Sequence, residues 1–463
     1  MNSQGLNTFS QSYFENILEK TIENGKNIFY KSKLIYKNKI DKIPNGIQIQ
    51  AISIDEEISI NVFIPNVSPE ISIDYTWKSK KFKELLDPTE GIRRGPFGSA
   101  LKKDFFVQNS EYVVYEQQNA IYDHFNTRYR ISEEKYHELK KFILLPGDFI
   151  MSGAGTIGKI SLVPEGIENG VFNQALIRLR VNKNTDKEFF LQWMRSPEMQ
   201  NKLTKANPAS AMVNLVPMSE VKEWDVIIPS PEEQSAIGSI FRTIDELLAS
   251  YKDNFANYQS LKATMLSEMF PKAGQTVPEI RLDGFDGEWE TKMLSEVTNI
   301  TMGQSPKSEN YTDNPNDYIL VQGNADIKDK QVVPRLWTTE VTKMAEIGDI
   351  ILTVRAPVGD IGKTDYNVVI GRGVAAIKGN DFIFYTLEKM KMSGFWNRFS
   401  TGSTFESISS NDIREAIIQI PTLKEQQSIG SYFYNLDQLI TSYQEKISQL
   451  ETLKKKLLQD MFI

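Results

Sequence analysis

The stretch Ile228–Phe241 reads IPSPEEQSAIGSIF, and Ile420–Phe433, 192 residues later, reads IPTLKEQQSIGSYF. The same offset continues without a gap for more than forty residues, so the chain contains an internal repeat. Each copy opens with Ser230 or Thr422 three residues before a glutamate, which is the spacing of a capping box at a helix start. The repeat therefore predicts two equivalent helices, one in each half of the chain.

The apolar residues of each copy are mostly spaced alternately by four and three positions. This spacing is typical of a coiled-coil seam, and it continues for about five heptads. The stripe includes Leu261 in the first copy and Leu453 in the second, and Pro271 ends the first helix. We expect helices over residues 230–271 and 422–463 that bury their seams against each other. The residues expected to pair are Ile237, Phe241, Ile244, Leu248, Tyr251, Phe255, Ile429, Phe433, Leu436, Ile440, Tyr443 and Ile447.

The segments ahead of the two helices match more loosely. The Gly-Asp pair at 147–148 corresponds to the Gly-Asp pair at 348–349, and Trp77 and Trp289 each precede a leucine and a glycine-rich turn. The layout is a globular unit, a long helix, a second globular unit and a second long helix. Because the helices are alike and the globular units differ, we expect one shared task and one task specific to each copy.

Two segments lie outside the repeat. Residues 1–74 have no counterpart in the second half, and the sequence assigns them no role. Apolar and polar residues alternate between Ile47 and Ile64, which predicts short strands there. Residues 272–288 are rich in glycine, proline and aspartate and are predicted to link the two halves.

The composition excludes several classes of protein. The 463 residues contain no cysteine, which excludes disulfides, thiol catalysis and cysteine-ligated zinc. The only histidines are His124 and His137, so a histidine-rich metal site is impossible. No apolar stretch approaches about 18 residues and no signal peptide is visible, so we expect a cytoplasmic protein without a membrane partner.

The charge is unevenly distributed. The formal net charge of −7 by itself argues against a nucleic-acid partner. Residues 78–103 nevertheless carry eight lysines and arginines against three acidic residues. A local basic patch of this kind can track phosphates, and a solvated lysine face is the alternative interpretation.

The segment Gly153–Lys159 contains a literal G-x-G-x-x-G and nearly matches a phosphate loop. A phosphate loop requires serine or threonine after the lysine, where Ile160 stands, and a dinucleotide site requires a following helix, where a strand is predicted. The repeat partner, Val354–Gly359, has lost two of the three glycines. We therefore expect a glycine-rich hairpin that brings backbone amides near an anion, and we find no catalytic motif.

Two diverged globular domains, each followed by a helix that opens on Glu-Gln, resemble the specificity subunit of type I restriction–modification enzymes. The resemblance rests on residues 229–238 and 421–430, on the two Gly-Asp strands, on the Gly-Pro-Phe-Gly-Ser turn at 95–99, and on 277–289 as a lead-in to a target domain. It covers roughly residues 75–463, although no Pro-Glu-Ile-Arg lead-in precedes Trp77.

The resemblance implies an α+β fold. It has two mixed α/β target-recognition domains in tandem, each followed by a long helix, and the two helices pair as an antiparallel coiled coil. The implied boundaries are an N-terminal extension over 1–74, a first target-recognition domain over 75–229, a first spacer helix over 230–271, a linker over 272–288, a second target-recognition domain over 289–421 and a second spacer helix over 422–463.

The resemblance also implies a non-catalytic protein that binds double-stranded DNA. Each domain recognises one half of a bipartite sequence, and the helices set the gap between the halves. The implied partners are two modification (methyltransferase) subunits, which dock on the helices and methylate adenine, and restriction subunits with translocase and nuclease activity. No cofactor is expected in this chain, whereas S-adenosylmethionine, ATP and magnesium are expected on the partner subunits.

Candidate DNA contacts are polar and basic residues in or near the glycine-rich loops, because such side chains can reach base edges and phosphates. Arg355 and Arg372 rank first, since arginine can bind both acceptors of guanine. The candidates in the first domain are Arg93, Arg94, Ser99, Lys102, Ser152, Lys159, Asn173, Gln174 and Arg178, and those in the second are Gln304, Ser305, Lys307, Arg355, Lys363, Arg372, Thr401, Ser403 and Thr404.

Two alternative functions stay open. The chain could be a stand-alone nucleotide-binding enzyme that uses the Gly153–Lys159 loop; tight nucleotide binding that is lost in Gly155→Val would support this. It could instead be a coiled-coil adaptor that does not bind DNA, in which case the assembled complex would show no sequence-dependent DNA binding.

Overall fold

The computed structural model describes residues 77–153, 155–204, 217–399 and 407–462, together with three strands nearer the N-terminus. These strands are β1 (Lys42–Ile43), β2 (Gly46–Ile52) and β3 (Ser59–Pro65), and β2 pairs antiparallel with β3 along its whole length. The short strands predicted from the alternation between Ile47 and Ile64 are therefore confirmed.

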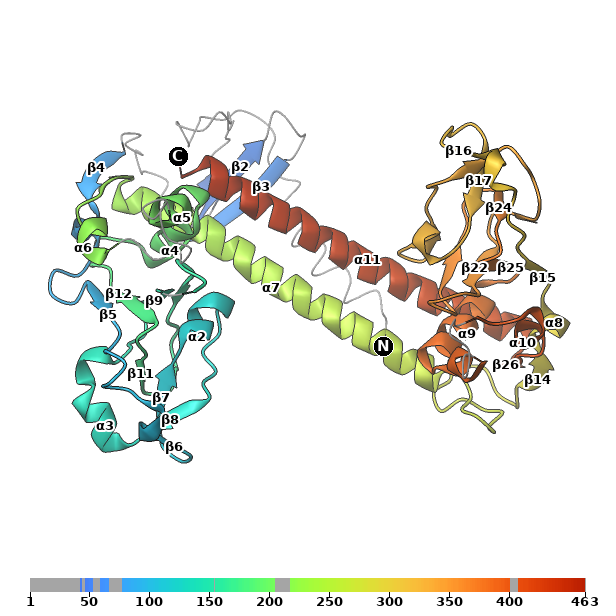
Figure 1. The fold of residues 1–463 in the computed structure, drawn as a ribbon, viewed down its shortest axis with the longest axis horizontal. Coiled ribbons are helices and arrows are strands. Elements are labelled where there is room, and N and C mark those ends of the chain that lie inside the picture. Colours follow the sequence, from blue (N-terminus) through green and yellow to red (C-terminus); the bar gives the residue numbers. More distant parts are fainter. Residues whose placement is uncertain are drawn as a thin grey trace. The chain divides into compact units, whose positions relative to one another are not determined.

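The chain forms two compact units (Figure 1). The first contains residues 1–250 and 447–463, and the second contains residues 251–446. Each unit consists of one globular domain and a part of each of two long helices. Both domains are mixed α/β, as predicted.

The globular domain of the first unit is built on two four-stranded sheets. One has the order β10-β9-β12-β5 with every pair antiparallel, and the other has the order β11-β7-β8-β6 with β11 and β7 parallel. A ribbon, β13-β4, pairs the last strand of the domain with its first. The strands are β4 (Lys78–Lys81), β5 (Ile92–Arg94), β6 (Phe106–Val107), β7 (Tyr112–Tyr115), β8 (Tyr129–Ile131), β9 (Phe149–Ser152), β10 (Ile160–Leu162), β11 (Gly170–Phe172), β12 (Leu176–Leu179) and β13 (Asp225–Ile228), and the helices are α2 (Gln117–Tyr122), α3 (Glu133–Glu138), α4 (Lys187–Arg195), α5 (Pro197–Thr204) and α6 (Met218–Val221).

Helix α4 joins this domain to the long helices. It begins where the side chain of Asp186 accepts a hydrogen bond from the backbone N–H of Phe189, as an N-cap does. Phe189, Phe190 and Trp193 of α4 are buried in the domain. Phe189 also packs edge-on against Phe462, with 5.7 Å between the ring centroids, so the domain shares its apolar core with the end of the chain.

The globular domain of the second unit repeats this plan with more strands. Six strands have the order β15-β25-β22-β23-β19-β18, five have the order β16-β20-β17-β24-β21, and a ribbon, β14-β26, again pairs the first strand with the last. The strands are β14 (Glu290–Met293), β15 (Ile300–Met302), β16 (Tyr311–Thr312), β17 (Tyr318–Val321), β18 (Ile327–Lys328), β19 (Gln331–Val332), β20 (Trp337–Thr338), β21 (Met344–Ala345), β22 (Ile350–Thr353), β23 (Ile361–Lys363), β24 (Val368–Ile370), β25 (Val374–Ile377) and β26 (Ile417–Ile420), and the helices are α8 (Leu294–Val297), α9 (Asp381–Met392) and α10 (Ser410–Arg414).

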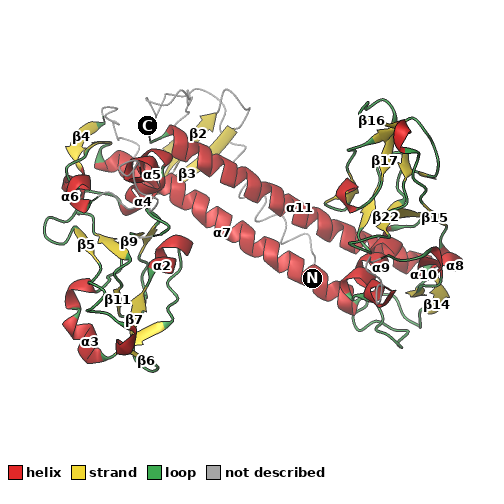
Figure 2. Cartoon of the chain, in the orientation of Figure 1, coloured by secondary structure: helices red, strands yellow, loops and turns green. Residues whose placement is uncertain are grey.

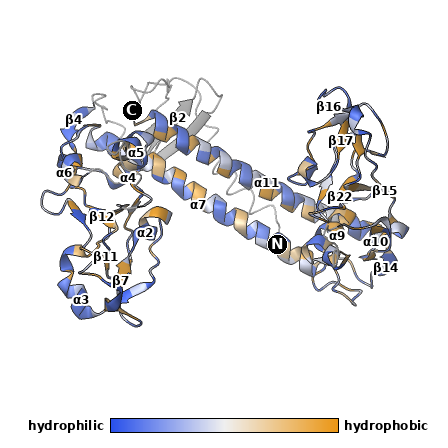
Figure 3. Cartoon of the chain, viewed as in Figure 1, coloured by the Kyte–Doolittle hydropathy of each residue, from blue (hydrophilic) through white to orange (hydrophobic). Residues whose placement is uncertain are grey.

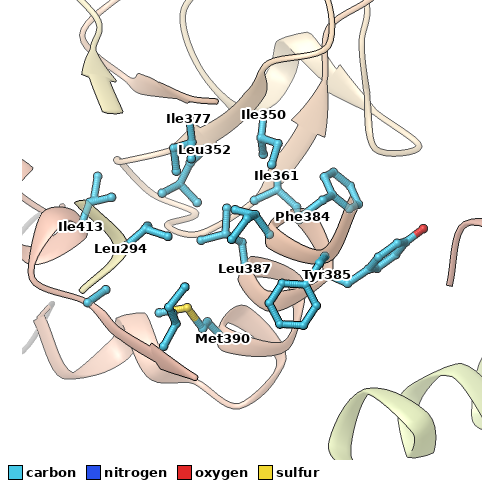
Figure 4. Close-up of a cluster of buried hydrophobic side chains, with 14 of the residues drawn as sticks. Leu294, Ile350, Leu352, Ile361, Ile377, Phe384, Tyr385, Leu387, Met390 and Ile413 are labelled. Atoms are coloured by element: carbon cyan, nitrogen blue, oxygen red, sulfur yellow. The ribbon is translucent and has the colours of Figure 1, made fainter. Parts of the chain in front are cut away.

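The core of the second domain lies between α9 and the larger sheet (Figure 4). Phe384 and Leu387 of α9 belong to one buried apolar cluster with Leu352 of β22 and Ile377 of β25. The side chain of Asn380 caps α9, where it accepts a hydrogen bond from a backbone N–H. The capped helix therefore occupies the same place in this domain as α4 does in the first.

The two long helices are α7 (Pro231–Glu268) and α11 (Leu423–Asp460), with 38 residues each (Figure 2). At a rise of about 1.5 Å per residue, each is about 57 Å long. Hydrophobic and hydrophilic residues are mixed along both helices (Figure 3). Among the described residues, no helix is long and apolar enough to cross a membrane.

Within each unit, the portions of α7 and α11 run antiparallel. In the first unit, the ring of Phe241 stacks on that of Phe462 with a centroid separation of 5.8 Å, and Asp245 binds Lys454 at 2.5 Å. In the second unit, Tyr258 contacts Tyr443 at 5.4 Å, and Phe270, just beyond α7, contacts Phe433 at 6.0 Å. In each unit, residues further along α7 or just beyond it therefore contact residues that come earlier in α11. A supercoil with knobs-into-holes packing stays a prediction.

Most residues expected to pair the helices are buried. Phe255 and three partners on α11 are half-buried. The half-buried partners are Ile440, Tyr443 and Ile447, and the buried residues are Ile237, Phe241, Ile244, Leu248, Tyr251, Ile429, Phe433 and Leu436.

The seam prediction is wrong at Leu261, whose side chain is 38% exposed. Lys262 is buried there instead, with 6% exposure. The seam positions alternate by steps of four and three, and the step of four after Tyr258 leads to Lys262 rather than to Leu261. The prediction considered apolar residues only, and it therefore missed Lys262 as the seam position. Because a buried ammonium group is costly without a partner, this position needs opposite charges nearby.

Candidate nucleic-acid interface

Three loops of the first domain meet beyond the ends of β5, β9 and β12. They are residues 95–101, 153 with 155–159, and 173–175, and we call them loop cluster 1. The backbone N–H of Gly95 donates to Leu176 O at 2.9 Å, and the N–H of Gly153 donates to Ala175 O at 2.7 Å. Residues 175 and 176, where the third loop enters β12, therefore hold the other two loops in place.

The second domain repeats the arrangement in residues 303–307, 354–360 and 371–373, which we call loop cluster 2. Here the N–H of Gly303 donates to Val374 O at 3.0 Å, and the N–H of Val354 donates to Gly373 O at 2.9 Å. These two hydrogen bonds correspond to those of loop cluster 1. The two clusters thus share one backbone scaffold.

Close backbone packing explains the glycine that begins each cluster. A Cβ atom on Gly95 would lie 1.9 Å from the carbonyl oxygen of Asn173, and one on Gly303 would lie 2.1 Å from that of Gly371. Real Cβ atoms do not approach so closely, so only glycine fits at either position.

The Gly153–Lys159 loop is a hairpin between the antiparallel strands β9 and β10, as predicted. The buried hydroxyl of Ser152 accepts a hydrogen bond from the N–H of Lys159 at 3.0 Å, and Thr353 accepts one from the N–H of Asp360 at 2.8 Å in the second domain. No helix follows the loop, so the structural context of a phosphate-binding loop is missing. We assign Ser152 to loop shape rather than DNA contact, which corrects its place among the candidates.

Five other candidates of the first domain lie exposed in or next to loop cluster 1: Arg94, Ser99, Lys102, Lys159 and Gln174. The side chain of Asn173 is half-buried and accepts a hydrogen bond from the N–H of Ala175 at 3.0 Å, which shapes the third loop.

Two further arginines are bound to one glutamate. Arg178 is 3% exposed, and its guanidinium lies 2.6 Å from the carboxylate of Glu90; Arg93 lies 2.9 Å from the same carboxylate and is half-buried. The hydrogen bonds from Arg178 and Arg93 lower the pKa of Glu90. Because Arg178 is buried, it has no exposed surface that DNA could contact, which contradicts its place among the candidate DNA contacts. Its ion pair with Glu90 instead holds β12 against the loop that contains Glu90.

Loop cluster 2 exposes Gln304, Lys307, Arg355 and Arg372. Ser305 is half-buried, and its hydroxyl accepts a hydrogen bond from the N–H of Arg372 at 3.0 Å. The two top-ranked arginines therefore lie in neighbouring loops of one cluster.

Four candidates of the second domain are not found in the cluster. Lys363 lies on β23, where it forms an ion pair with Asp381 of α9, so the structure places it away from the loops. Thr401, Ser403 and Thr404 lie outside the described residues.

The sequence analysis missed Phe97, which is 89% exposed in loop cluster 1. A phenylalanine between a proline and a glycine, in a turn followed by lysines, was the available signal.

It also missed a polar joint that ties each domain to both helices. In the first unit, Asp245 of α7 binds Lys454 of α11 at 2.5 Å and accepts a hydrogen bond from Gln192 of α4 at 3.1 Å. In the second unit, Asp437 of α11 occupies the place of Asp245, since the two lie 192 residues apart in the repeat.

The joint of the second unit carries more charge. Asp437 binds Lys262 at 2.6 Å and accepts a hydrogen bond from Tyr385 of α9 at 3.0 Å. Lys330 and Glu388 join them, with 2.7 Å between their charged groups. Burial lowers the pKa of Lys262, and the two carboxylates oppose that shift. The described residues contain no cluster of acidic or histidine side chains that could hold a metal ion.

Comparison with known proteins points to one family. The model of the type I restriction modification DNA specificity domain matches residues 74–254 and 286–452. The MjaX specificity subunit of a type I restriction enzyme from Methanocaldococcus jannaschii is 26% identical over 343 residues, which cover 71% of this chain and 80% of that protein. The MjaVIII specificity subunit from the same organism is 20% identical over 413 residues, 82% and 95% of the two chains.

Two solved structures share the fold. The S subunit of a type I restriction-modification system from M. genitalium superposes with a TM-score of 0.54 at 17% identity, over 86% of this chain and 98% of that one. A chain from a study of complex assembly and conformational transition in a type I R-M system gives a TM-score of 0.50 at 23% identity, over 85% and 99% of the two chains.

Proposed function

Because the chain belongs to the family of type I restriction modification DNA specificity domains, we propose that it is the specificity subunit of a type I restriction–modification complex. Each domain reads one half of a bipartite target in double-stranded DNA through its own loop cluster.

The observation that carries the proposal is a shared loop scaffold with different exposed side chains. Loop cluster 1 presents Gln174 on its third loop, and Arg94 and Lys102 flank its first loop. Loop cluster 2 instead presents Arg355 on its second loop and Arg372 on its third. Arginine and glutamine side chains can form paired hydrogen bonds with guanine and adenine, respectively, in the major groove. A constant scaffold with variable side chains is suited to two half-sites of different sequence.

The long helices carry the shared task. Their repeated sequence and repeated joints present two like surfaces to partners, and two like partners fit two like surfaces. We assign these surfaces to two modification subunits, with restriction subunits completing the complex. S-adenosylmethionine, ATP and magnesium bind those partners, and this chain contributes recognition without catalysis.

Half-site competition tests the proposal. The chain is purified with its cognate modification subunits, and the methylated adenines of cells that carry the complex define the target. Labelled target duplex is then competed with duplexes altered in the first half, in the second half or in the gap. We expect both half-site variants to compete poorly and the gap variant to compete as well as the target.

The assay is run at near-physiological salt, because phosphate contacts dominate at low salt and hide sequence preference. Equal competition by all duplexes would refute DNA reading and favour the adaptor alternative. A complex that carries both Arg94→Ala and Arg372→Ala should lose its preference for the target over the half-site variants. If it keeps that preference, residues outside these loops recognise the sequence.

A further inference from the structure

Phe97 has the highest exposed fraction of any large apolar side chain in the described part of the chain, at 89%. Single exposed apolar side chains are common on protein surfaces, so what marks Phe97 as a candidate contact is its place among the loops of cluster 1, next to exposed lysines. It lies at the tip of the first loop of cluster 1.

The backbone around Phe97 holds the ring outward. The N–H of Ala100 donates to Phe97 O at 2.8 Å and closes a turn, and Pro96 is buried beneath it. A Cβ on Gly98 would lie 2.6 Å from Oε1 of Gln174, so the turn packs directly on the third loop. Because the backbone of the turn is already fixed, binding through Phe97 has to order the ring alone.

The surroundings of the ring suit DNA. Arg94, Lys102 and Lys103 are exposed on either side of it in the sequence, with Asp104 the single acid between residues 95 and 105. Lysine and arginine bind phosphates, which an apolar ring cannot do. The apolar surfaces that DNA offers beside its phosphates are the faces of the bases and the methyl group of thymine in the major groove.

We infer that Phe97 inserts its ring against the base stack of the half-site read by the first domain, an assignment that rests on the proposed function. The ring partly unstacks one base step and fixes the position of the domain along the duplex, as apolar wedges do in other DNA-binding proteins.

The wedge belongs to one half-site only. The shared hydrogen bonds match Gly95 to Gly303, so the position of Phe97 corresponds to Ser305 in loop cluster 2. Ser305 carries no ring, and its hydroxyl is engaged by the N–H of Arg372. The second half-site is therefore read without unstacking at this point.

The test uses the complex with its modification subunits and target duplexes in which 2-aminopurine replaces single adenines other than the methylated ones, because a methyltransferase flips its target base out of the stack and would raise the fluorescence by itself. In the wild type, we expect increased fluorescence at one step of the first half-site and no change in the second. Phe97→Ala should abolish the fluorescence increase. It should also weaken target binding about five- to a hundred-fold, because stacking of an aromatic ring on a base changes the binding constant by about that factor. Phe97→Trp should retain both the fluorescence increase and the affinity for the target.

Leu145→Ala is the matched control, because Leu145 is an exposed apolar residue of the same domain at the opposite end of β9 from the Gly153 loop. It should bind and fluoresce like the wild type. Unchanged fluorescence and affinity in Phe97→Ala, or a loss of affinity with the fluorescence increase retained, would overturn the wedge. Sequence-independent binding by the wild-type complex would instead overturn the proposed function itself.

Discussion

Replacing Lys262 by methionine perturbs the charged joint of the second unit. The ammonium group of Lys262 lies 2.6 Å from Asp437 and 2.9 Å from Glu388, and Lys330 binds the same two carboxylates. Burial and the Asp437 carboxylate raise the pKa of Tyr385, whose hydroxyl stays protonated and donates to Asp437. The joint balances two lysines against two carboxylates, and methionine would leave one carboxylate in excess.

The size of the effect follows from this geometry. Removing one partner of a buried ion pair costs about 3–5 kcal/mol, because the other charge stays buried. The side chains of Asp437 and Glu388 are 21% and 20% exposed and Lys330 remains, so we reduce the cost to about 2 kcal/mol. Methionine replaces the aliphatic stem of lysine, so lost packing adds little. For a unit of about 200 residues, this loss lowers the melting temperature by roughly 4–8 °C.

Lys454→Met is the control, because Lys454 holds the same position in the repeat as Lys262. Its partner Asp245 is 35% exposed, and such a pair contributes under about 1 kcal/mol. Thermal unfolding of the full chain by circular dichroism compares the variants, and hydrogen exchange over residues 425–446 locates the loss. The double variant Lys262→Met with Asp437→Asn restores the charge balance and should recover most of the stability. Equal melting temperatures for the two lysine variants, or no recovery in the double variant, would refute the reasoning.

Three further predictions concern the loops and their supports. Arg372→Ala should weaken target binding by about tenfold or more and relax discrimination in the second half-site alone, and competition with half-site variants measures this. Gly303→Ala should lower the melting temperature and abolish reading of the second half-site, because its Cβ would strike backbone; Gly323→Ala, which meets nothing within 4 Å, should do neither. Glu90→Gln should reduce the loss of unfolding free energy that the wild type shows as the pH is lowered into the acid range, as measured by denaturant unfolding at a series of pH values. The pKa of Glu90 is lowered from 4.5, so its contribution is present above that value and is lost as the pH falls through the lowered pKa; an unchanged loss in the acid range would contradict the assigned pairing with Arg178.

The helices could be predicted from the sequence because their signal is local and occurs twice. Capping boxes and a four-three spacing both lie within single segments, and an offset of 192 residues connects the copies. Lys262 was missed since a charged residue on a seam contradicts an apolar pattern. Its partners Glu388 and Lys330 lie far away in the sequence, and only the fold brings them together.

The candidate loops were found by their glycines, but their assembly was not predictable in detail. Gly95 and Leu176 are hydrogen-bonded across some eighty residues, and no local pattern specifies such a contact. Ser152 and Arg178 were chosen for their polarity, yet each lies in a four-residue strand that is buried at every position. A polar residue within a short apolar strand is more often a support of the fold than a contact. Exposure, which distinguishes Phe97, depends on the same long-range packing.

Exchange of one domain tests the central claim most directly. Residues 289–421 are replaced by the corresponding domain of another family member with a known target, and methylated adenines are mapped in cells that carry the hybrid complex. We predict that one half of the methylated sequence changes to that of the donor, while the other half and the gap remain. A change in both halves, or in neither, would contradict the assignment of one half-site to each domain.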